Sequence, residues 1–300
     1  MDPAALRAMQ SLAAECWQLD PQSVNSAASV GELAWDHGTP QAEGEEPKRY
    51  RLWRDGDDVV AWGALYPPTM VTRTAERQEL SKATLVWQIR PGRIELLDDI
   101  LDWFAAETPG QRQTFVREAN VPARERIEAR GYIYDPSDGF DIMNTRDLRE
   151  IAEPRVPPGY RPATMAEVQD VEKRVAVHRA AWEPSSLTVE KYRGAMSTPT
   201  YRAELDFVVV APDASLACSA LGWYDAPNRA GEFEPVGTHP DHRRLGLASA
   251  ALLFGMQRFR DAGATHAIIG CRGDDGYPIP KLVYHALGFK EISRDMPYVR

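Results

Sequence analysis

One segment, residues 234–248, combines residue types and spacing that favour phosphate binding. A strand ends there, a loop with small residues follows, and a long helix begins at Gly246. The first amide groups of a helix have no partner within the helix and carry partial positive charge, so they can hold phosphate oxygens. Arg243 and Arg244 add two cationic side chains. The glycine spacing fits neither a Walker loop nor a dinucleotide-binding fingerprint.

The elements that must position this loop are predicted from the residues around it. Turn residues and runs rich in β-branched residues predict strands over 205–210, 216–224, 232–238 and 266–271. The spacing of apolar residues predicts helices from residue 164 onward, where Thr164 and Glu167 have a capping-box pattern, and over 188–196, 246–261 and 281–287. Gly288 ends the last helix, and Phe289 opens a final strand.

The order Arg243-x-x-Gly246-x-Ala248 resembles the Arg/Gln-x-x-Gly-x-Gly/Ala motif of the GNAT acetyltransferase superfamily. Residues 238–240 before the motif and residues 282–289 after it resemble the flanking segments of that family in the expected order. The resemblance covers about the last half of the chain. It implies an N-acetyltransferase that uses acetyl-CoA, with the pantetheine arm of CoA lying in a gap where one strand separates from its neighbour.

Carried over residue by residue, the resemblance assigns the cofactor contacts. Val236 and Thr238 would bond pantetheine through the strand backbone, the N–H of Val236 would also polarise the thioester carbonyl, and the loop amides would hold the diphosphate. The cofactor-binding residues expected in this way are Val236, Gly237, Thr238, Arg243, Arg244, Leu245, Gly246, Leu247, Ala248 and Ser249.

Acetyl transfer to an amine requires a base for the amine and a proton for the departing thiolate. Tyr284 matches the position of the family's usual general acid, and its alternative role is packing. Glu234 shares a strand face with Val236, which makes it the candidate base, and its alternative role is that of a solvated carboxylate. Many relatives carry an Asn shortly before the tyrosine, where this chain has residues 277–280 without one.

Acceptor-binding candidates come from two places that flank the predicted site. Trp182 follows the first helix of this half, and Trp223 and Asp225 end the strand opposite. They could bind a cationic substrate, although packing is the more common role of a single aromatic side chain. His178 is a weaker candidate for the acceptor site. His239 and His242 are expected to shape the cofactor loop, and because no third ligand accompanies them we expect no metal site.

The first half of the chain has a similar order of predicted elements. Helices are expected over 4–19, 94–106 and 122–130, and strands over 49–54, 59–66, 83–89 and 113–117. The matching order predicts a duplicated fold, with two tandem GNAT-like domains of the α/β class (α+β type), each a mixed, mostly antiparallel sheet flanked by helices. The loop at 90–96 is shortened and has lost the glycine spacing, so we expect no CoA site in this half. Five of its tryptophans, Trp35, Trp53, Trp62, Trp87 and Trp103, are expected to pack in the core rather than to form an acceptor-facing wall or a domain interface.

Composition and length set the remaining expectations. The 300 residues suit two domains, and the stretch 150–159, with three prolines and a glycine, predicts a linker between a domain at 1–149 and one at 160–300. Three scattered cysteines, with no signal peptide and no long apolar run, predict a cytoplasmic protein that does not bind membranes. The net charge of −9 argues against nucleic-acid binding and is compatible with a cationic acceptor.

The leading hypothesis is therefore transfer of acetyl from acetyl-CoA to a primary amine of a small molecule, by direct attack in a ternary complex. Two alternatives stay open at this point: an acyltransferase that uses a longer acyl-CoA, and an acyl-CoA-binding module without catalysis. The sequence does not identify the acceptor, nor whether the protein is a monomer or a homodimer.

Overall fold

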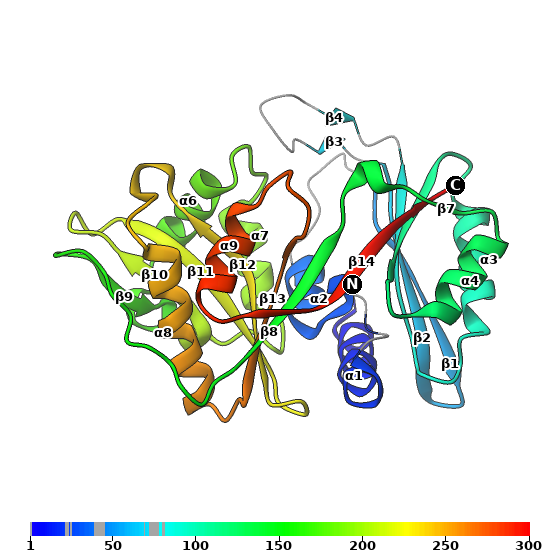
Figure 1. The fold of residues 1–300 in the computed structure, drawn as a ribbon, viewed down its shortest axis with the longest axis horizontal. Coiled ribbons are helices and arrows are strands. Elements are labelled where there is room, and N and C mark those ends of the chain that lie inside the picture. Colours follow the sequence, from blue (N-terminus) through cyan, green and yellow to red (C-terminus); the bar gives the residue numbers. More distant parts are fainter. Residues whose placement is uncertain are drawn as a thin grey trace.

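The computed structural model describes residues 2–21, 24, 26–38, 46–68, 70–71, 78–79 and 82–300. Most of the strands among these residues belong to one long sheet (Figure 1). In spatial order its strands are β1 (Arg49–Asp55), β2 (Asp58–Tyr66), β5 (Ala83–Ile89), β6 (Arg112–Arg117), β14 (Lys290–Val299), β8 (Asp141–Asp147), β13 (His266–Arg272), β12 (Ala230–Thr238), β11 (Leu216–Asp225), β10 (Asp206–Val210) and β9 (Arg161–Thr164). Strand β7 (Ile133–Tyr134) also pairs with β14, and β3 (Met70–Val71) pairs with β4 (Gln78–Glu79).

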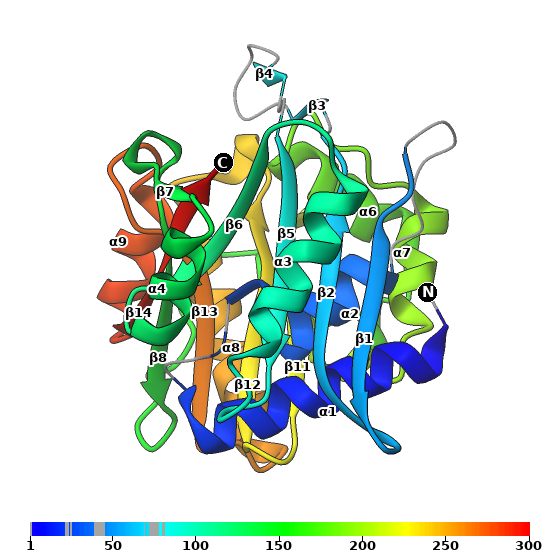
Figure 2. The same ribbon diagram turned by 90° about the vertical axis from the view of Figure 1, so that its right-hand side faces the viewer.

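Helices cover both faces of this sheet. The first half of the chain contributes α1 (Pro3–Leu19), α2 (Val30–Gly38), α3 (Leu96–Glu107) and α4 (Val121–Ala129). The second half contributes α5 (Met165–Val168), α6 (Val171–Ala181), α7 (Val189–Met196), α8 (Leu247–Asp261) and α9 (Ile279–Ala286). Helices α3 and α4 lie on the outer face of the first half, whereas α1 and α2 lie between the two halves (Figure 2).

The two halves repeat one order of elements, which confirms the predicted duplication. With the short strands β3, β4, β7 and β9 and the one-turn helix α5 left aside, two helices are followed by three strands, a helix, a strand, a helix and a final strand in each half. In each half the helix in the middle, α3 or α8, joins the two parallel strands, β5 to β6 or β12 to β13, and every other pairing in the long sheet is antiparallel. The mixed, mostly antiparallel sheet expected from the sequence is therefore present.

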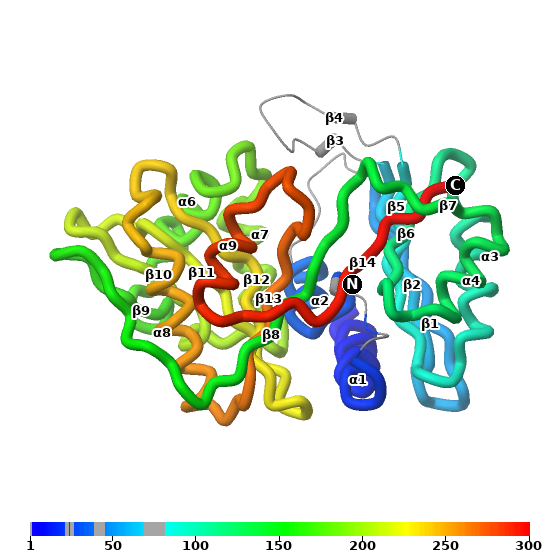
Figure 3. The backbone as a smooth tube through the Cα atoms, viewed as in Figure 1, coloured from blue at the N-terminus to red at the C-terminus, as the bar shows by residue number. Residues whose placement is uncertain are grey.

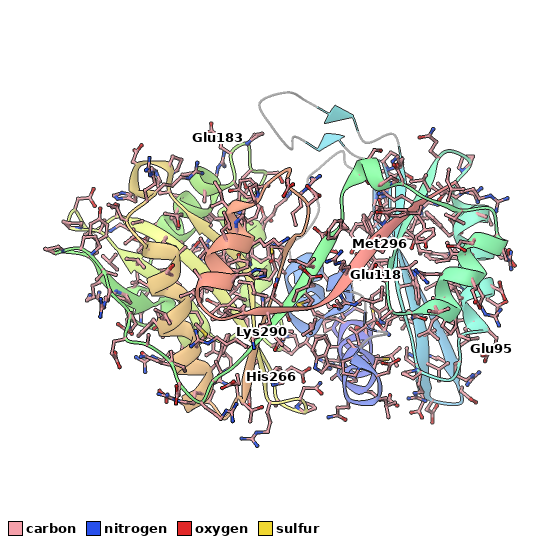
Figure 4. The ribbon with its side chains drawn as sticks, in the orientation of Figure 1. Glu95, Glu118, Glu183, His266, Lys290 and Met296 are labelled. Carbon is pink, nitrogen blue, oxygen red and sulfur yellow. The ribbon has the colours of Figure 1, made fainter. Side chains whose placement is uncertain are left out.

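Each half is completed by the last strand of the other. Strand β8, which ends the first half, lies between β13 and β14, and β14, which ends the second half, crosses to pair with β6 and β7 (Figure 3). Met296 pairs with Val116, and the amide of Glu118 donates to the carbonyl of Arg294 at 2.8 Å in the same region (Figure 4). The stretch 150–159 contains no helix or strand, but the halves on either side of it are not complete by themselves.

Local sequence signals explain most of the element boundaries. The hairpin between β1 and β2 turns at Gly56, whose φ of +59° suits glycine. Helix α8 ends at Gly263, with φ of +103°, and the amide of Ala264 returns to the carbonyl of Phe259. The helix expected from residue 164 is interrupted: Gln169 adopts a left-handed conformation, and Asp170 caps a new helix by accepting from the amide of Lys173.

The shared sheet predicts that the two halves unfold together. Phe104 is fully buried in the core of the first half, so Phe104→Ala should cost about 3–5 kcal/mol. Because β14 and β8 join the cores, differential scanning calorimetry should show one transition that moves to lower temperature as a whole. Two transitions, of which only one moves, would show that the halves are energetically independent.

Candidate active site

The two parallel strands of the second half separate partway along their length. β12 pairs with β13 only from Ala230 to Phe233, opposite His266 to Ile269. Beyond that point β12 remains paired with β11 as far as Thr238, and β13 remains paired with β8 as far as Arg272. The facing edges of residues 234–238 and 270–272 therefore have no strand partner between them, and we call this region the strand opening. An extended ligand can bond its free backbone groups as a missing strand would.

The loop after β12 leads directly into the N-terminus of α8. Residues Pro240–His242 form one turn of 3-10 helix, and Arg244 and Gly246 have φ values of +65° and +74°. Gly246 caps α8 without any side-chain hydrogen bond, and no atom lies within 4 Å of the position that a Cβ would occupy there. The amides of the first helical turn are therefore accessible, in an open cradle that suits an anion.

The side chains of this loop divide into those that hold it and those that face outward. Arg243 donates to the carbonyls of Thr238 and Ala181, both at 3.4 Å, and so ties the loop to β12 and α6. His239 accepts from the amide of Asp241, and His242 contacts the hydroxyl of Tyr160 at 2.9 Å, so both histidines shape the loop as expected. Arg243, Arg244 and Leu245 are all exposed. Both cations therefore face solvent beside the cradle, and Arg243 in addition bonds the backbone.

Tyr284 lies on α9, the helix that follows β13, and its side chain is 7% exposed. Burial raises the pKa of its hydroxyl well above the ordinary value, and the charge of Glu234 is the largest electrostatic contribution in the same direction. Tyr284 is therefore within electrostatic range of Glu234, although the two residues come from different elements. The tyrosine keeps its proton throughout the neutral range.

Glu234 belongs to a cluster of carboxyl groups drawn from both halves of the chain. Glu234 is half-buried, and its pKa is raised by burial and by the charges of Glu232 and Asp141. Glu32, on α2 of the first half, also has its pKa raised, first by burial and then by the charge of Glu234. The charge of Glu234 therefore opposes ionisation of Glu32, and the two carboxyl groups are electrostatically linked.

Glu232 has a structural task that distinguishes it from Glu234. Its side chain is 5% exposed and accepts from the amide of Gly31 at 2.8 Å and from the hydroxyl of Ser29. These two residues start α2, so Glu232 caps that helix and ties it to β12. Burial raises the pKa of Glu232 to about 7, even though these hydrogen bonds favour the ionised form.

The three predicted acceptor residues are not all at the site. Trp182 is 48% exposed and lies against Gly237, where a side-chain carbon would approach its indole nitrogen to 2.9 Å. Trp223 is fully buried and donates to the carbonyl of Glu234 at 2.7 Å, so it supports the strand and presents no surface to an acceptor. Asp225 pairs with Ala230 at the end of β12 opposite the loop and accepts from Asn228, so it lies away from the strand opening.

Sequence reasoning missed the contribution of α2. The ring of Trp35 lies 5.5 Å from that of His178, between the two halves. Trp35 therefore lies at a domain interface, whereas the sequence favoured core packing. Burial lowers the pKa of His178 to about 3, which keeps its ring neutral.

Trp62 and Trp87 are core residues as expected, and Trp53 packs against Trp103. The available signal for α2 was the spacing of Ser29 and Glu32, a capping-box pattern whose hydroxyl accepts from the Glu32 amide at 3.2 Å.

The first half has a corresponding strand opening, but side chains close it. β5 pairs with β6 only from Ala83 to Leu85. The hydroxyl of Thr114 then donates to the carbonyl of Leu85 at 2.9 Å and accepts from the indole of Trp87 at 3.1 Å. The first turn of α3 carries two acidic residues, Asp98 and Asp99, which oppose a bound anion.

Two further properties concern the residues that the structure describes. Among them no group of three or more His, Cys, Asp or Glu side chains could hold a metal ion. None of their helices is long and apolar enough to cross a membrane.

No family model matches the chain. Among curated proteins it is similar to the mycothiol acetyltransferase of Saccharomonospora viridis, with 31% identity over 186 residues that make up 55% of this chain. The match spans 60% of the length of that relative.

Two solved structures have a similar fold over nearly the whole chain. A GCN5-related N-acetyltransferase from Sphaerobacter thermophilus aligns with 100% of this chain and 93% of its own, with a TM-score of 0.62 and 18% identity. A tandem GNAT protein from the clavulanic acid biosynthesis pathway aligns with 98% of this chain and 94% of its own, with a TM-score of 0.65 and 16% identity. The chain therefore has the tandem GNAT fold, and the resemblance carried by Arg243, Gly246 and Ala248 is confirmed at the level of the fold.

The open cradle at Gly246 predicts a substitution that separates folding from ligand binding. Gly246→Glu places a negative side chain beside the first amides of α8, where it competes with a diphosphate. The left-handed backbone costs about 1–2 kcal/mol, which a domain of this size tolerates. Isothermal titration calorimetry should show loss of acetyl-CoA binding while circular dichroism shows an intact fold.

Gly92 offers a matched control in the equivalent loop of the first half. Its φ is +88° and its Cβ position is also empty, so Gly92→Glu introduces the same charge and the same strain. Because Trp87 and Thr114 close that half, this variant and the wild type should both bind one acetyl-CoA per chain with equal affinity. Two equivalent sites per chain, or loss of binding in Gly92→Glu, would refute the assignment.

Proposed function

We propose that this protein is an N-acetyltransferase that moves acetyl from acetyl-CoA to a primary amine of a small molecule, by direct attack in a ternary complex. The observation that carries the proposal is the strand opening between β12 and β13, with the cradle at Gly246 at its mouth and Glu234 and Tyr284 on its two sides. A site that only binds acyl-CoA has no need of a carboxylate and a tyrosine placed in this way.

The residues present fit acetyl-CoA. The amides of Leu247, Ala248 and Ser249, together with the side chain of Arg244, would hold the diphosphate. The backbone of Val236 and Thr238 on the free edge of β12 would bond the pantetheine arm, and Gly237 leaves room for Trp182 beside it. Acetyl-CoA supplies an activated thioester, and the protein contributes orientation and proton transfer.

Proton transfer is assigned to the two groups on either side of the opening. The acceptor arrives as an ammonium ion, and the ionised Glu234 takes one of its protons, directly or through a water, so that the nitrogen lone pair attacks the thioester carbon. The carbon–sulfur bond then breaks, and Tyr284 gives its proton to the leaving thiolate. The acetylated nitrogen loses its extra proton to the tyrosinate, which restores Tyr284, and Glu234 returns its proton to solvent. Once Glu234 has become neutral it no longer raises the pKa of Tyr284, so the first transfer makes the tyrosine a better donor for the second.

The first half of the chain contributes to acceptor recognition in this proposal. Glu32 brings a second carboxyl group beside Glu234, and the pair attracts a cationic amine as it approaches. The half-exposed ring of Trp182 offers a surface next to the strand opening for the body of the acceptor. The test is release of CoA, measured with acetyl-CoA against a panel of small amines, with a longer acyl-CoA in parallel. Absence of CoA release for every amine and donor would reject the enzymatic proposal.

Substitution of the tyrosine isolates its hydroxyl. Tyr284→Phe keeps the ring and its packing against Phe289, but it removes the proton donor. Turnover should fall by about two orders of magnitude, because a positioned acid contributes about that factor. Acetyl-CoA affinity should change much less, since the hydroxyl acts mainly in the transition state. Steady-state kinetics with any active amine provide the measurement, and wild-type turnover in the variant would leave water as the donor.

The carboxyl pair predicts a pH dependence with a defined sign. The base acts only when ionised, and its pKa is raised, so kcat/KM should rise with pH over a range well above the ordinary glutamate value. Glu234→Gln should abolish this rise of kcat/KM with pH, the rising limb of the pH profile, together with most of the activity. Glu32→Gln removes a like charge, so it should move the rising limb to lower pH. Glu95→Gln is the control, because Glu95 lies at the far end of the first half (Figure 4), and it should leave the rising limb at its wild-type pH. If Glu234→Gln keeps the wild-type limb, the titrating base is another group.

A further inference from the structure

Asn144 is a fully buried polar residue that the first half inserts into the second. It lies on β8 opposite Ile269, the last residue of β13 that pairs with β12. Its side-chain nitrogen lies 3.3 Å from the carbonyl oxygen of Ile269 and 3.6 Å from the sulfur of Cys271. Its side-chain oxygen lies 3.1 Å from Nε2 of His285 on α9.

These contacts determine the direction of each hydrogen bond. The carbonyl of Ile269 can only accept, so Nδ2 of Asn144 donates to it and Oδ1 faces His285. An amide oxygen can only accept, so His285 presents Nε2–H. One buried side chain thus links the edge of the strand opening to the helix that carries Tyr284.

The groups that Asn144 holds are the immediate neighbours of Tyr284. His285 follows Tyr284 in α9, and Cys271 is the next electrostatic influence on the tyrosine after Glu234. A second residue of β8, Arg146, donates to the carbonyl of Leu287, which caps the same helix. Strand β8 therefore fixes the C-terminal end of α9 relative to β13 at two points.

We propose that Asn144 is a positioning residue for the general acid: it sets the place of α9, and thereby of the Tyr284 hydroxyl, at the strand opening. The inference rests on the proposed function, because it assumes that Tyr284 donates a proton there. It assigns to the first half a direct influence on chemistry that takes place in the second.

The neighbouring residue provides a matched control. Thr145 lies on the same strand, and its hydroxyl donates to the carbonyl of Ala267, also on β13, at 3.2 Å. Thr145→Val and Asn144→Ala each remove a hydrogen bond from β8 to β13, but only the second removes the link to α9. Asn144→Ala should lower kcat about tenfold or more, because small displacements of a catalytic group cost that much. Thr145→Val should keep wild-type kcat, and KM for acetyl-CoA should stay within about twofold in both.

Two further variants separate positioning from a general loss of structure. In a Tyr284→Phe background, Asn144→Ala should cause no additional loss of kcat, because it acts through the hydroxyl that is already absent. His285→Ala should reproduce the defect of Asn144→Ala, and His285→Gln, which keeps an N–H near the position of Nε2, should restore most of the activity. A full additional loss in the Tyr284→Phe background, or no rescue by His285→Gln, would overturn the proposal.

A measurement without turnover tests the placement itself. With tyrosine rings labelled by carbon-13, the resonance of Tyr284 is assigned as the signal that Tyr284→Phe removes. It should shift in Asn144→Ala and remain in place in Thr145→Val. An unchanged resonance in Asn144→Ala would overturn the positioning role even if the protein acetylates amines. A shifted resonance in a protein that releases no CoA would support the placement and reject the proposed function instead.

Discussion

The structure depends on the exchange of two strands between the halves of the chain. Without β8, the sheet of the second half would end at β13 and leave α9 without the contacts made by Asn144 and Arg146. Without β14, the first half would lose the partner of β6 and β7. Backbone groups at a sheet edge must find partners, so each half meets this requirement with a strand of the other. The same exchange joins the halves through one continuous sheet and helps to hold α2 against β12.

Placing α2 there brings acidic groups together at an energetic cost. Carboxyl groups lose hydration when buried and repel one another when ionised. Glu232 offsets part of this cost because it caps the N-terminus of α2, where the helix dipole favours negative charge. Glu32 and Glu234 have no comparable compensation among the hydrogen bonds described, and their pKa values are raised accordingly. Buried groups held at such a cost are typical of sites that transfer protons or bind cations.

The parts of this site that sequence predicted are those encoded locally. Gly246 and the residues around it carry their conformation and amide geometry in one short segment, and the apolar spacing of α8 determines which side faces the core. Glu32, Trp35 and Asn144 reach the site through pairings between distant segments, which no local pattern specifies. For the same reason, proximity in sequence to β12 did not reveal that α2 covers Trp223 or that Asp225 lies at the end of the strand opposite the loop.

The two halves show how one fold can keep or lose a site without changing its topology. Both contain a strand opening, because a helix joins two parallel strands that separate in each. In the second half, Gly246 carries no side chain that could enter the cradle, so the backbone groups there remain available. In the first half, the hydroxyl of Thr114 accepts from the indole of Trp87 and donates to the carbonyl of Leu85, which an extended ligand would need. The first half has instead become a partner for the second, since it supplies Glu32 from α2 and Asn144 from β8 to the remaining site.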